Sequence, residues 1–305
     1  MRSIAVIIPY FGKWPSWADV FFHSCAMNDT VDFFFFTDCP MPMFADGVKN
    51  LHFNRVSFGR YCEMVSQKLD LNFFPDNTYK LCDIRPFYGI IHGDILDDFD
   101  FWGFGDLDLV WGDIRSFYTD DILEEFDILS THADRISGHL ALFRNLPDYN
   151  TAALKIPNWR SLLEDKKHYA MDEQHFTLLF YPEAKWLWKI HKYIYLRLKY
   201  EDEWYLYSRF LKRVNALIGI KKRRLFFVEQ NTTPWFTDEM VKDETIRQQW
   251  RWRYNNEKVY DFKRDKELIY LHFLCLKKYW KENFMHINEL KKSVMISLDG
   301  LYETN

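Results

Sequence analysis

The sequence of 305 residues predicts an α/β protein with a mostly parallel central sheet flanked by helices. Two runs of buried type, Ile4 to Ile8 and Asp32 to Phe36, lack the alternation of a half-exposed strand and are typical of strands covered on both faces. Residues 16–28 between them can form a helix, so the chain opens with a β-α-β unit. In such sheets, ligands bind at the carboxyl ends of the strands.

The following segments continue this alternation, and the composition then changes. We expect helices over 57–70 and 80–97, strands from Phe99 to Val110 and from Ile136 to Arg144, and a helix from Asp172 to Phe180. Near residue 183 the sequence becomes rich in aromatic and basic residues at helix-compatible spacing. These observations predict a core over 1–183 and a helical C-terminal region over 184–305.

The composition excludes several classes of protein. Hydrophobic residues make up 48% of the chain and aromatic residues 19%, which argues against disorder. The five cysteines are scattered without Cys-x-x-Cys spacing, so neither a disulfide framework nor a zinc site is indicated. No apolar run approaches the roughly 18 residues that cross a bilayer, and the first run is too short for a signal peptide. These features predict a cytoplasmic protein.

Charge is unevenly distributed along the chain, although the net charge is only −4. From Gly93 to Ser130 there are twelve Asp or Glu residues and one basic residue. From Lys185 to Arg224 there are twelve Lys or Arg residues and three acids. An acidic centre and a basic later segment are expected to have different roles.

The segment Gly105 to Asp113 contains the most informative motif, an Asp-x-Asp. In an extended segment, Asp106 and Asp108 point to the same face while Leu107 and Leu109 can enter the core. Two such carboxylates form half of a divalent-cation site, and a cation held by few protein oxygens keeps positions open for phosphates. The alternative is a strand end with two solvated aspartates.

A late segment, Leu271 to Trp280, offers an imidazole and, six residues on, an ammonium group. His272 can complete the coordination of a Mn²⁺-like ion, and Lys278 can neutralise a diphosphate leaving group. The alternative is an aromatic helix with one core histidine and two solvated lysines. Together with the Asp-x-Asp, the segment indicates an enzyme that acts on a nucleotide-activated substrate.

With these residues, the sequence resembles the metal-dependent GT-A glycosyltransferases, particularly the retaining glycogenin-like and capsule-galactosyltransferase kinds, which have a Rossmann-like core. Those enzymes carry an Asp-x-Asp and a late His-Phe-x-Gly-x-x-Lys-Pro-Trp motif. Here His272, Phe273, Lys278 and Trp280 match, while Cys275 replaces the glycine and a tyrosine replaces the proline. The opening Ile-Ala-Val-Ile-Ile-Pro-Tyr-Phe-Gly resembles bacterial GT-A transferases of capsule and O-antigen clusters.

The resemblance implies residues that bind the nucleotide-sugar donor and the metal. The segment Lys80 to Gly89 resembles a Ser-Asp-x-x-Arg-Tyr helix of related sugar transferases; the alternative is a surface helix with an ion pair. The implied donor contacts are Pro9, Tyr10, Phe11, Asp38, Lys80, Asp83, Arg85, Asp106 and Lys278. The implied metal ligands, for Mn²⁺ or Mg²⁺, are Asp106, Asp108 and His272. For Asp38, a turn or a helix cap is an equal alternative.

The same resemblance implies residues on the acceptor side of the site. Ser137-Gly138-His139 lies where such enzymes place acceptor-side loop residues, and a glycine there allows close approach to the backbone. Asp172 and Glu173 resemble an acidic helix start that faces the sugar, with favourable first-turn charge as the alternative. The candidate catalytic residues are therefore Asp172, Glu173 and His139.

The basic segment after Lys185 has two interpretations. Aromatic rings interleaved with lysine and arginine suit the headgroup region of an anionic membrane on its inner face, where a polyprenol-diphosphate-linked acceptor would reside. A helical subdomain that packs its aromatic residues internally is the alternative. We do not expect nucleic-acid binding, because the centre of the chain is acidic and no nucleic-acid module is recognisable.

Taken together, these features predict a cytoplasmic, metal-dependent glycosyltransferase that moves a hexose from a UDP-sugar to a lipid-linked or polysaccharide acceptor. Galactose and a retaining mechanism are implied by resemblance alone, as is a role in bacterial surface glycan synthesis. Two other functions stay open. One is a metal-dependent phosphohydrolase with Asp106 as nucleophile and Asp108 as acid, and the other is a non-catalytic carbohydrate-binding protein.

Overall fold

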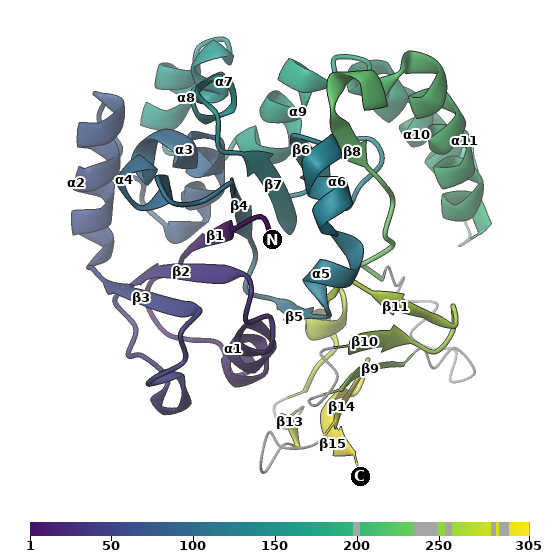
Figure 1. Cartoon of the computed structure of the whole chain (residues 1–305), viewed down its shortest axis with the longest axis horizontal. Helices are drawn as coiled ribbons and strands as arrows, with labels where there is room; N and C mark the ends of the chain where they lie inside the picture. The colour runs from purple at the N-terminus through teal and green to yellow at the C-terminus, as the bar shows by residue number, and fades with distance from the viewer. Residues whose placement is uncertain (198–201, 235–248, 254–257, 282–284, 287–292, 305) are drawn as a thin grey trace.

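The structure, a computed structural model, describes residues 1–197, 202–234, 249–253, 258–281, 285–286 and 293–304 (Figure 1). Its centre is a seven-stranded sheet with strand order β3-β2-β1-β4-β7-β6-β8. These strands are β1 (Ile4–Pro9), β2 (Asp32–Thr37), β3 (Leu51–Arg55), β4 (Phe101–Gly105), β6 (Ile128–Ser130), β7 (Leu140–Arg144) and β8 (Leu225–Phe227). Neighbours run parallel except at β7, which is antiparallel to β4 and β6. The predicted α/β class is confirmed.

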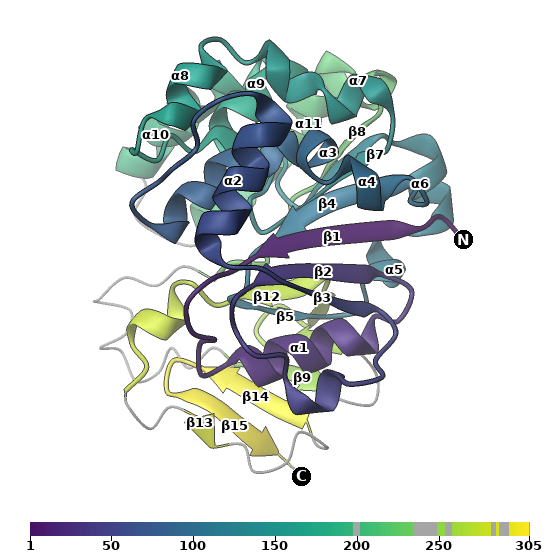
Figure 2. The same ribbon diagram turned by 90° about the vertical axis from the view of Figure 1, so that its left-hand side faces the viewer.

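Helices cover both faces of this sheet (Figures 1 and 2). The α-helices are α1 (Ala18–Met27), α2 (Phe58–Leu69), α3 (Tyr88–Ile91), α4 (Gly93–Leu96), α5 (Ile114–Phe117), α6 (Asp120–Glu125), α7 (Pro147–Asn150), α8 (Trp159–Glu164), α9 (Phe176–Phe180), α10 (Ala184–Arg197) and α11 (Asp202–Ile218). Tighter turns are η1 (Met43–Ala45), η2 (Thr78–Phe87), η3 (Ala152–Lys155), η5 (Ile220–Arg223) and η6 (Leu276–Lys278), and η4 (Met171–His175) is a π-helical turn. The helix expected over 80–97 is broken into η2, α3 and α4, because Pro86 interrupts its hydrogen bonding.

The position of β1 between two hydrophobic cores explains why its sequence shows no polar alternation. Ile4, Val6 and Ile8 are buried against the side of the sheet that α1 covers. Ala5 and Ile7 are buried in the core on the other side. Both sets of side chains are removed from water, so every position of the strand is apolar.

The strand expected from Phe99 to Val110 is wrong as a single element. β4 ends at Gly105, and β5 (Leu109–Trp111) leaves the central sheet to pair with β12 (Tyr270–His272). The Asp-x-Asp therefore lies in the bend between two strands of different sheets. Consequently Asp106 and Asp108 need not share a face, although Leu107 and Leu109 are buried as expected.

The C-terminal region is helical only in its first part. α10 and α11 fit the expectation, but most of the described segments after residue 249 form a sheet with the order β11-β10-β9-β14-β15-β13, which corrects the predicted helical region. These strands are β9 (Trp250–Arg253), β10 (Lys258–Asp261), β11 (Lys266–Leu268), β13 (Met285–His286), β14 (Ser293–Ser297) and β15 (Gly300–Thr304). The reason is a two-residue period, because Trp250 and Trp252 are buried while Arg251 between them is not.

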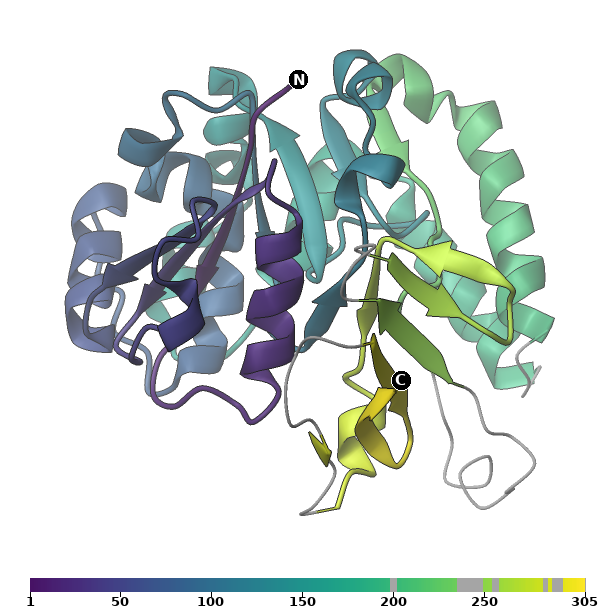
Figure 3. The ribbon, with the colours of Figure 1, turned by 60° about the horizontal axis from the view of Figure 1, so that its bottom comes forward.

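This second sheet packs against α1, so that α1 is covered on two sides (Figures 2 and 3). Val20 of α1 and Val110 of β5 are buried in the same cluster as Trp250 and Trp252. Phe21 and Phe22 of α1 are buried toward the central sheet instead. A helix enclosed in this way is apolar around most of its circumference.

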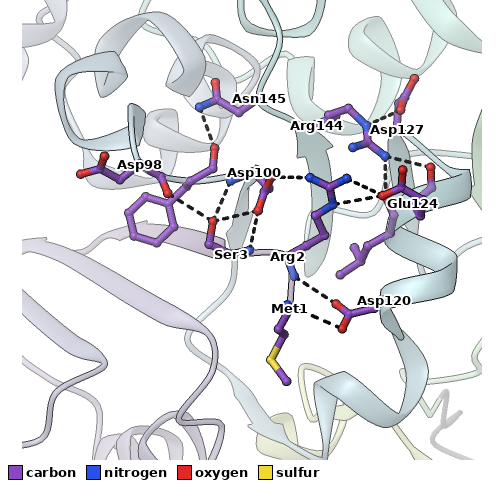
Figure 4. Close-up of polar contacts among 12 residues, drawn as sticks. Met1, Arg2, Ser3, Asp98, Asp100, Asp120, Glu124, Asp127, Arg144 and Asn145 are labelled. Atoms are coloured by element: carbon purple, nitrogen blue, oxygen red, sulfur yellow. Dashed lines mark hydrogen bonds and ion pairs between the residues drawn. The ribbon is translucent and has the colours of Figure 1, made fainter.

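A group of charged residues closes the edge of the central sheet opposite to the carboxyl ends of β1 and β4 (Figure 4). Arg2, just before β1, forms ion pairs with Asp100 at 2.9 Å and with Glu124 of α6. Asp127, just before β6, accepts hydrogen bonds from Arg144 Nε at 2.5 Å and Arg224 Nε at 2.7 Å. These contacts join the residues just before β1, β4, β6 and β8 to the last residue of β7.

We predict that Asp127→Asn lowers the unfolding free energy at pH 7 by about 2–3 kcal/mol, because charged hydrogen bonds to two arginines are lost. Burial opposes ionisation of Asp127, but bonds from Arg224, Tyr149 and Arg144 outweigh it, so the pKa is lowered. Because its folded-state pKa is lowered, Asp127 stabilises the folded protein at pH values above its unfolded pKa of about 4. This stabilisation is lost as the pH falls through the folded-state pKa. Denaturant unfolding should therefore show the two proteins converging at acidic pH. Exposed Asp98→Asn is the control and should change little.

Candidate functional site

The direction of β7 places the candidate site residues at one edge of the sheet. β1, β4, β6 and β8 have their carboxyl ends there, and the antiparallel β7 begins there. Asp106 follows β4 directly, and His139 directly precedes β7. The backbone N–H of Asp106 donates to the carbonyl of His139 at 3.3 Å, so the two residues are adjacent.

Three side chains at this edge form a candidate metal centre. Ligand atoms of Asp106, His139 and His272 all lie within 4.8 Å of one another. The ring centroids of His139 and His272 are 3.7 Å apart. His272 arrives from β12, where it pairs with Leu109 of β5. Of the three predicted ligands, Asp106 and His272 belong to this group, and His139, predicted as catalytic, takes the third place.

Asp108 lies beside this group with different partners. Its Oδ2 is 3.3 Å from His272 Nε2 and accepts a hydrogen bond from Lys277 Nζ at 2.7 Å. Burial opposes its ionisation, but His272 and Lys277 outweigh burial and hold the pKa of Asp108 below its usual value. Lys278, the lysine implied by resemblance, is exposed. Sequence reasoning missed Lys277, because two adjacent lysines carry no signal that tells which one turns inward.

Thr233 orients both imidazoles. Its hydroxyl is 3.0 Å from His272 Nδ1 and 3.4 Å from His139 Nδ1. A hydroxyl has one proton, so it can donate to one ring and accept from the other, which leaves the Nε2 atoms for other partners. Burial lowers the pKa of His139 well below its usual value, and a neutral imidazole is the form that binds a metal. Nothing in the sequence around Thr233 indicates this role.

Arg85 connects the metal centre to the acidic turn η4. Its guanidinium forms an ion pair with Asp106 and donates to Asp172 Oδ2 at 3.0 Å and to the carbonyl of Gly138 at 3.1 Å. The cation also lies 5.7 Å from the centre of the Phe104 ring. One side chain therefore fixes segments from η2, the Asp-x-Asp bend, the loop before β7 and η4.

Asp172 and Glu173 pack around Gly138. Glu173 Oε1 accepts from the backbone N–H of Gly138 at 3.0 Å. A Cβ at Gly138 would lie 3.1 Å from Glu173 Oε1 and 3.3 Å from Asp172 Oδ2, so a larger residue there would push these carboxylates outward by a few tenths of an ångström. Burial raises the pKa of Asp172 to about 7 even though Arg85 opposes the shift. The structure thus brings Asp172, Glu173 and His139 to the same edge.

Lys80 and Asp83, predicted as donor contacts, are buried and contact only other parts of the protein. Both side chains are almost completely buried and form an ion pair at 3.0 Å. Lys80 Nζ donates to the carbonyls of Leu162 and Lys167, and Asp83 accepts from the backbone N–H of Met171. This is the ion pair of the alternative interpretation, although it is buried. It holds the loop that leads to Asp172, and neither side chain can touch a ligand.

A second exposed group lies at the carboxyl ends of β1 and β2. Tyr10 stacks on Trp14 with ring centroids 5.1 Å apart. Asp38 is exposed and accepts from the backbone N–H of Gly12 at 2.7 Å, and Gly12 has the positive φ of +106° that favours glycine. Of the other predicted contacts there, Pro9 is half-buried and Phe11 is buried in the core.

The residues of the metal centre fit a divalent cation. One carboxylate and two imidazoles form a mixed oxygen and nitrogen donor set, and Asp108 contacts His272 from outside this group. Imidazole ligands suit transition metals, whereas Mg²⁺ prefers oxygen ligands and water. Of the two expected ions, this donor set favours Mn²⁺.

The strand order and this edge define an α/β protein with a candidate cation site at the carboxyl ends of its strands. The chain belongs to the family of unknown function DUF6625, whose profile matches residues 6–305. No curated protein matches the sequence.

The solved structures to which the chain is similar include three of glycosyltransferases. Mouse xyloside xylosyltransferase 1 in its apo form has a TM-score of 0.40 and 11% identity over 90% of this chain and 98% of that one. An active-site mutant of LgtC has a TM-score of 0.34 and 10% identity over 57% and 71% of the two chains. The galactosyltransferase LgtC with donor and acceptor sugar analogues has a TM-score of 0.33 and 12% identity over 57% and 72%. Similarity at this level does not assign a function.

We predict that Mn²⁺ binds the protein and that Asp106→Asn, His139→Ala and His272→Ala each weaken binding at least tenfold, because each removes a ligand atom. Isothermal titration with Mn²⁺ measures this loss. His23→Ala, a histidine of α1 outside the group, is the control and should bind as the wild type does. Equal affinity in all four variants would contradict the assignment.

We further predict that Asp172 makes stability depend on pH. Its folded-state pKa of about 7 lies above the unfolded value of about 4, so stabilisation is complete below pH 4 and is lost as the pH rises through 7. The Asn side chain of Asp172→Asn cannot ionise. Between pH 4 and pH 7 the unfolding free energy of this variant should therefore fall by about 3 kcal/mol less than that of the wild type. Urea unfolding across this range tests this, with exposed Asp148→Asn as the control.

Proposed function

We propose that this chain is a metal-dependent glycosyltransferase that takes a hexose from a UDP-sugar. The observation that carries the proposal is the grouping of Asp106, His139 and His272 within 4.8 Å beside Asp108. A cation held there by few protein atoms keeps positions for a diphosphate. The stacked Tyr10 and Trp14 and the exposed Asp38 lie at the same edge, where a base and a ribose would extend from that diphosphate.

The chain's own residues would control charge around the leaving group. The bound metal would supply positive charge to the departing diphosphate. Lys277, held by Asp108 and half-buried, would add a second positive charge on the C-terminal side. Arg85 binds Oδ1 of Asp106 and so holds this carboxylate beside His139 and His272. We assign Lys277, rather than Lys278, to the leaving group.

On the acceptor side, Asp172 and Glu173 would face the sugar and the attacking hydroxyl. Glu173 also holds the backbone N–H of Gly138, and Glu173, Asp172 and Arg85 fill the space beside this glycine, so a substrate would meet these side chains and not the Gly138 backbone. We propose retention because the segment from His272 to Trp280 resembles the late motif of retaining enzymes, in which the leaving diphosphate can take the acceptor proton. Galactose as the sugar, a lipid-linked or polysaccharide acceptor and a place in bacterial surface glycan synthesis complete the proposal.

The two alternative functions have less support from the contacts. A phosphohydrolase needs Asp108 as a proton donor, yet Lys277 and His272 hold Asp108 as an anion. Arg85 also occupies one oxygen of Asp106, the nucleophile of that mechanism. A carbohydrate-binding protein without catalysis would not need the positive charge of Lys277 beside the candidate metal centre.

Titration of UDP into the purified protein, with and without Mn²⁺, tests the proposal. We predict Mn²⁺-dependent UDP binding that Asp106→Asn loses, and slow release of UDP from a UDP-hexose that this variant lowers at least a hundredfold. Lys277→Ala should reduce turnover about tenfold or more, while Lys278→Ala serves as the matched control and should not.

The outcomes separate the three functions. Absence of UDP binding with Mn²⁺ present would overturn the glycosyltransferase assignment. Phosphate release from a phosphomonoester would favour the hydrolase. Sugar binding that Asp106→Asn does not change would favour the binding protein.

A further inference from the structure

Helices α10 and α11 lie side by side beyond β8 (Figure 1) and are rich in basic residues. The described side chains of these helices, at 184–193 and 207–218, include six Lys or Arg residues and no Asp or Glu. They are Lys185, Lys189, Lys192, Arg209, Lys212 and Arg213. The side chains of residues 194–206 lie outside the described part. Among the described residues, no helix has the length and hydropathy needed to span a membrane.

The inner faces of the two helices attach them to the core. Leu187 of α10 and Leu211 of α11 are buried in the cluster beneath the central sheet. The Tyr207 hydroxyl donates to the carbonyl of Leu187 at 3.3 Å, and the Tyr207 ring stacks on His191. Asn215 of α11 donates to a carbonyl in the loop after β6. The remaining faces point away from the protein.

The outer faces combine basic residues with large exposed apolar ones. At about 100° per residue, the exposed residues 185, 186, 189, 192 and 193 fall within about a third of the circumference of α10. Trp186 and Tyr193 of α10 are 42% and 55% exposed, and Phe210 and Leu217 of α11 are 38% and 88% exposed. Solvent-facing Trp and Leu beside lysines are unfavourable in water and suit a surface with anionic headgroups above an apolar layer.

We propose that this outer surface of α10 and α11, the basic helical face, docks the protein on an anionic lipid membrane. Lysine and arginine would pair with lipid phosphates, while Trp186, Tyr193, Phe210 and Leu217 would enter the headgroup region. A nucleic acid could satisfy the charges but would not bury Leu217. Figure 2 shows α10 on the side toward which β1 points, the side of the candidate site. The docking requires no metal and therefore does not depend on the proposed function.

Co-sedimentation of the full chain with vesicles tests this surface. The protein should bind phosphatidylcholine vesicles only when phosphatidylglycerol is included, and binding should weaken as salt rises. Lys189→Glu/Lys212→Glu should reduce binding about tenfold or more, at about 1 kcal/mol for each basic residue near the surface. The matched control, Lys49→Glu/Lys155→Glu, changes the net charge equally at exposed positions elsewhere and should bind as the wild type does.

A second variant tests the apolar part of the proposal separately from the electrostatic part. Leu217→Asn should weaken binding at high salt, where apolar contact is the main remaining attraction. Circular dichroism and Mn²⁺ binding like those of the wild type would show that the variants fold. Equal vesicle binding by Lys189→Glu/Lys212→Glu and the control would overturn the proposal. Single-stranded RNA that displaces the vesicles, with unchanged binding by Leu217→Asn, would identify a nucleic-acid surface instead.

Discussion

The contacts of the Arg85 guanidinium are the constraint on which the site depends. Three separate segments meet it, through Phe104 and Asp106 at the end of β4, the carbonyl of Gly138 and Asp172. A buried cation must be neutralised and hydrogen-bonded to remain in place, and here two carboxylates do both. The same contact fixes one oxygen of Asp106 and thereby orients its carboxylate within the candidate metal centre. Loss of this side chain would leave two buried carboxylates uncompensated.

The second constraint is the pairing of β12 with β5. It brings His272 next to Leu109 and lets Lys277 reach Asp108, although these residues are far apart in sequence. The C-terminal sheet supports the pair from below by packing Trp250 and Trp252 against α1 and β5. The site is therefore completed only when the last part of the chain has folded onto the first.

Charged residues at the two edges of the sheet have different roles because their surroundings differ. At the amino edge, Arg2 and Asp127 form ion pairs with residues of opposite charge and stabilise the fold. At the carboxyl edge, Asp106, His139 and His272 face one another with their ligand atoms directed to a common point. The acidic centre seen in the sequence thus contains two unrelated groups. Composition could not separate them, because it does not record which acids already have a basic partner.

Local sequence was enough to predict the β-α-β opening and the α/β class, and it singled out Asp106 and His272, which the structure places close together. Uninterrupted apolar runs report burial on both faces, and short-range spacing reports shared faces. Tertiary structure alone decided that Lys277 turns inward instead of Lys278, that Lys80 and Asp83 are buried, and that the described segments after residue 249 are mostly strands. These outcomes depend on contacts between residues distant in sequence, which no local pattern of residue types encodes.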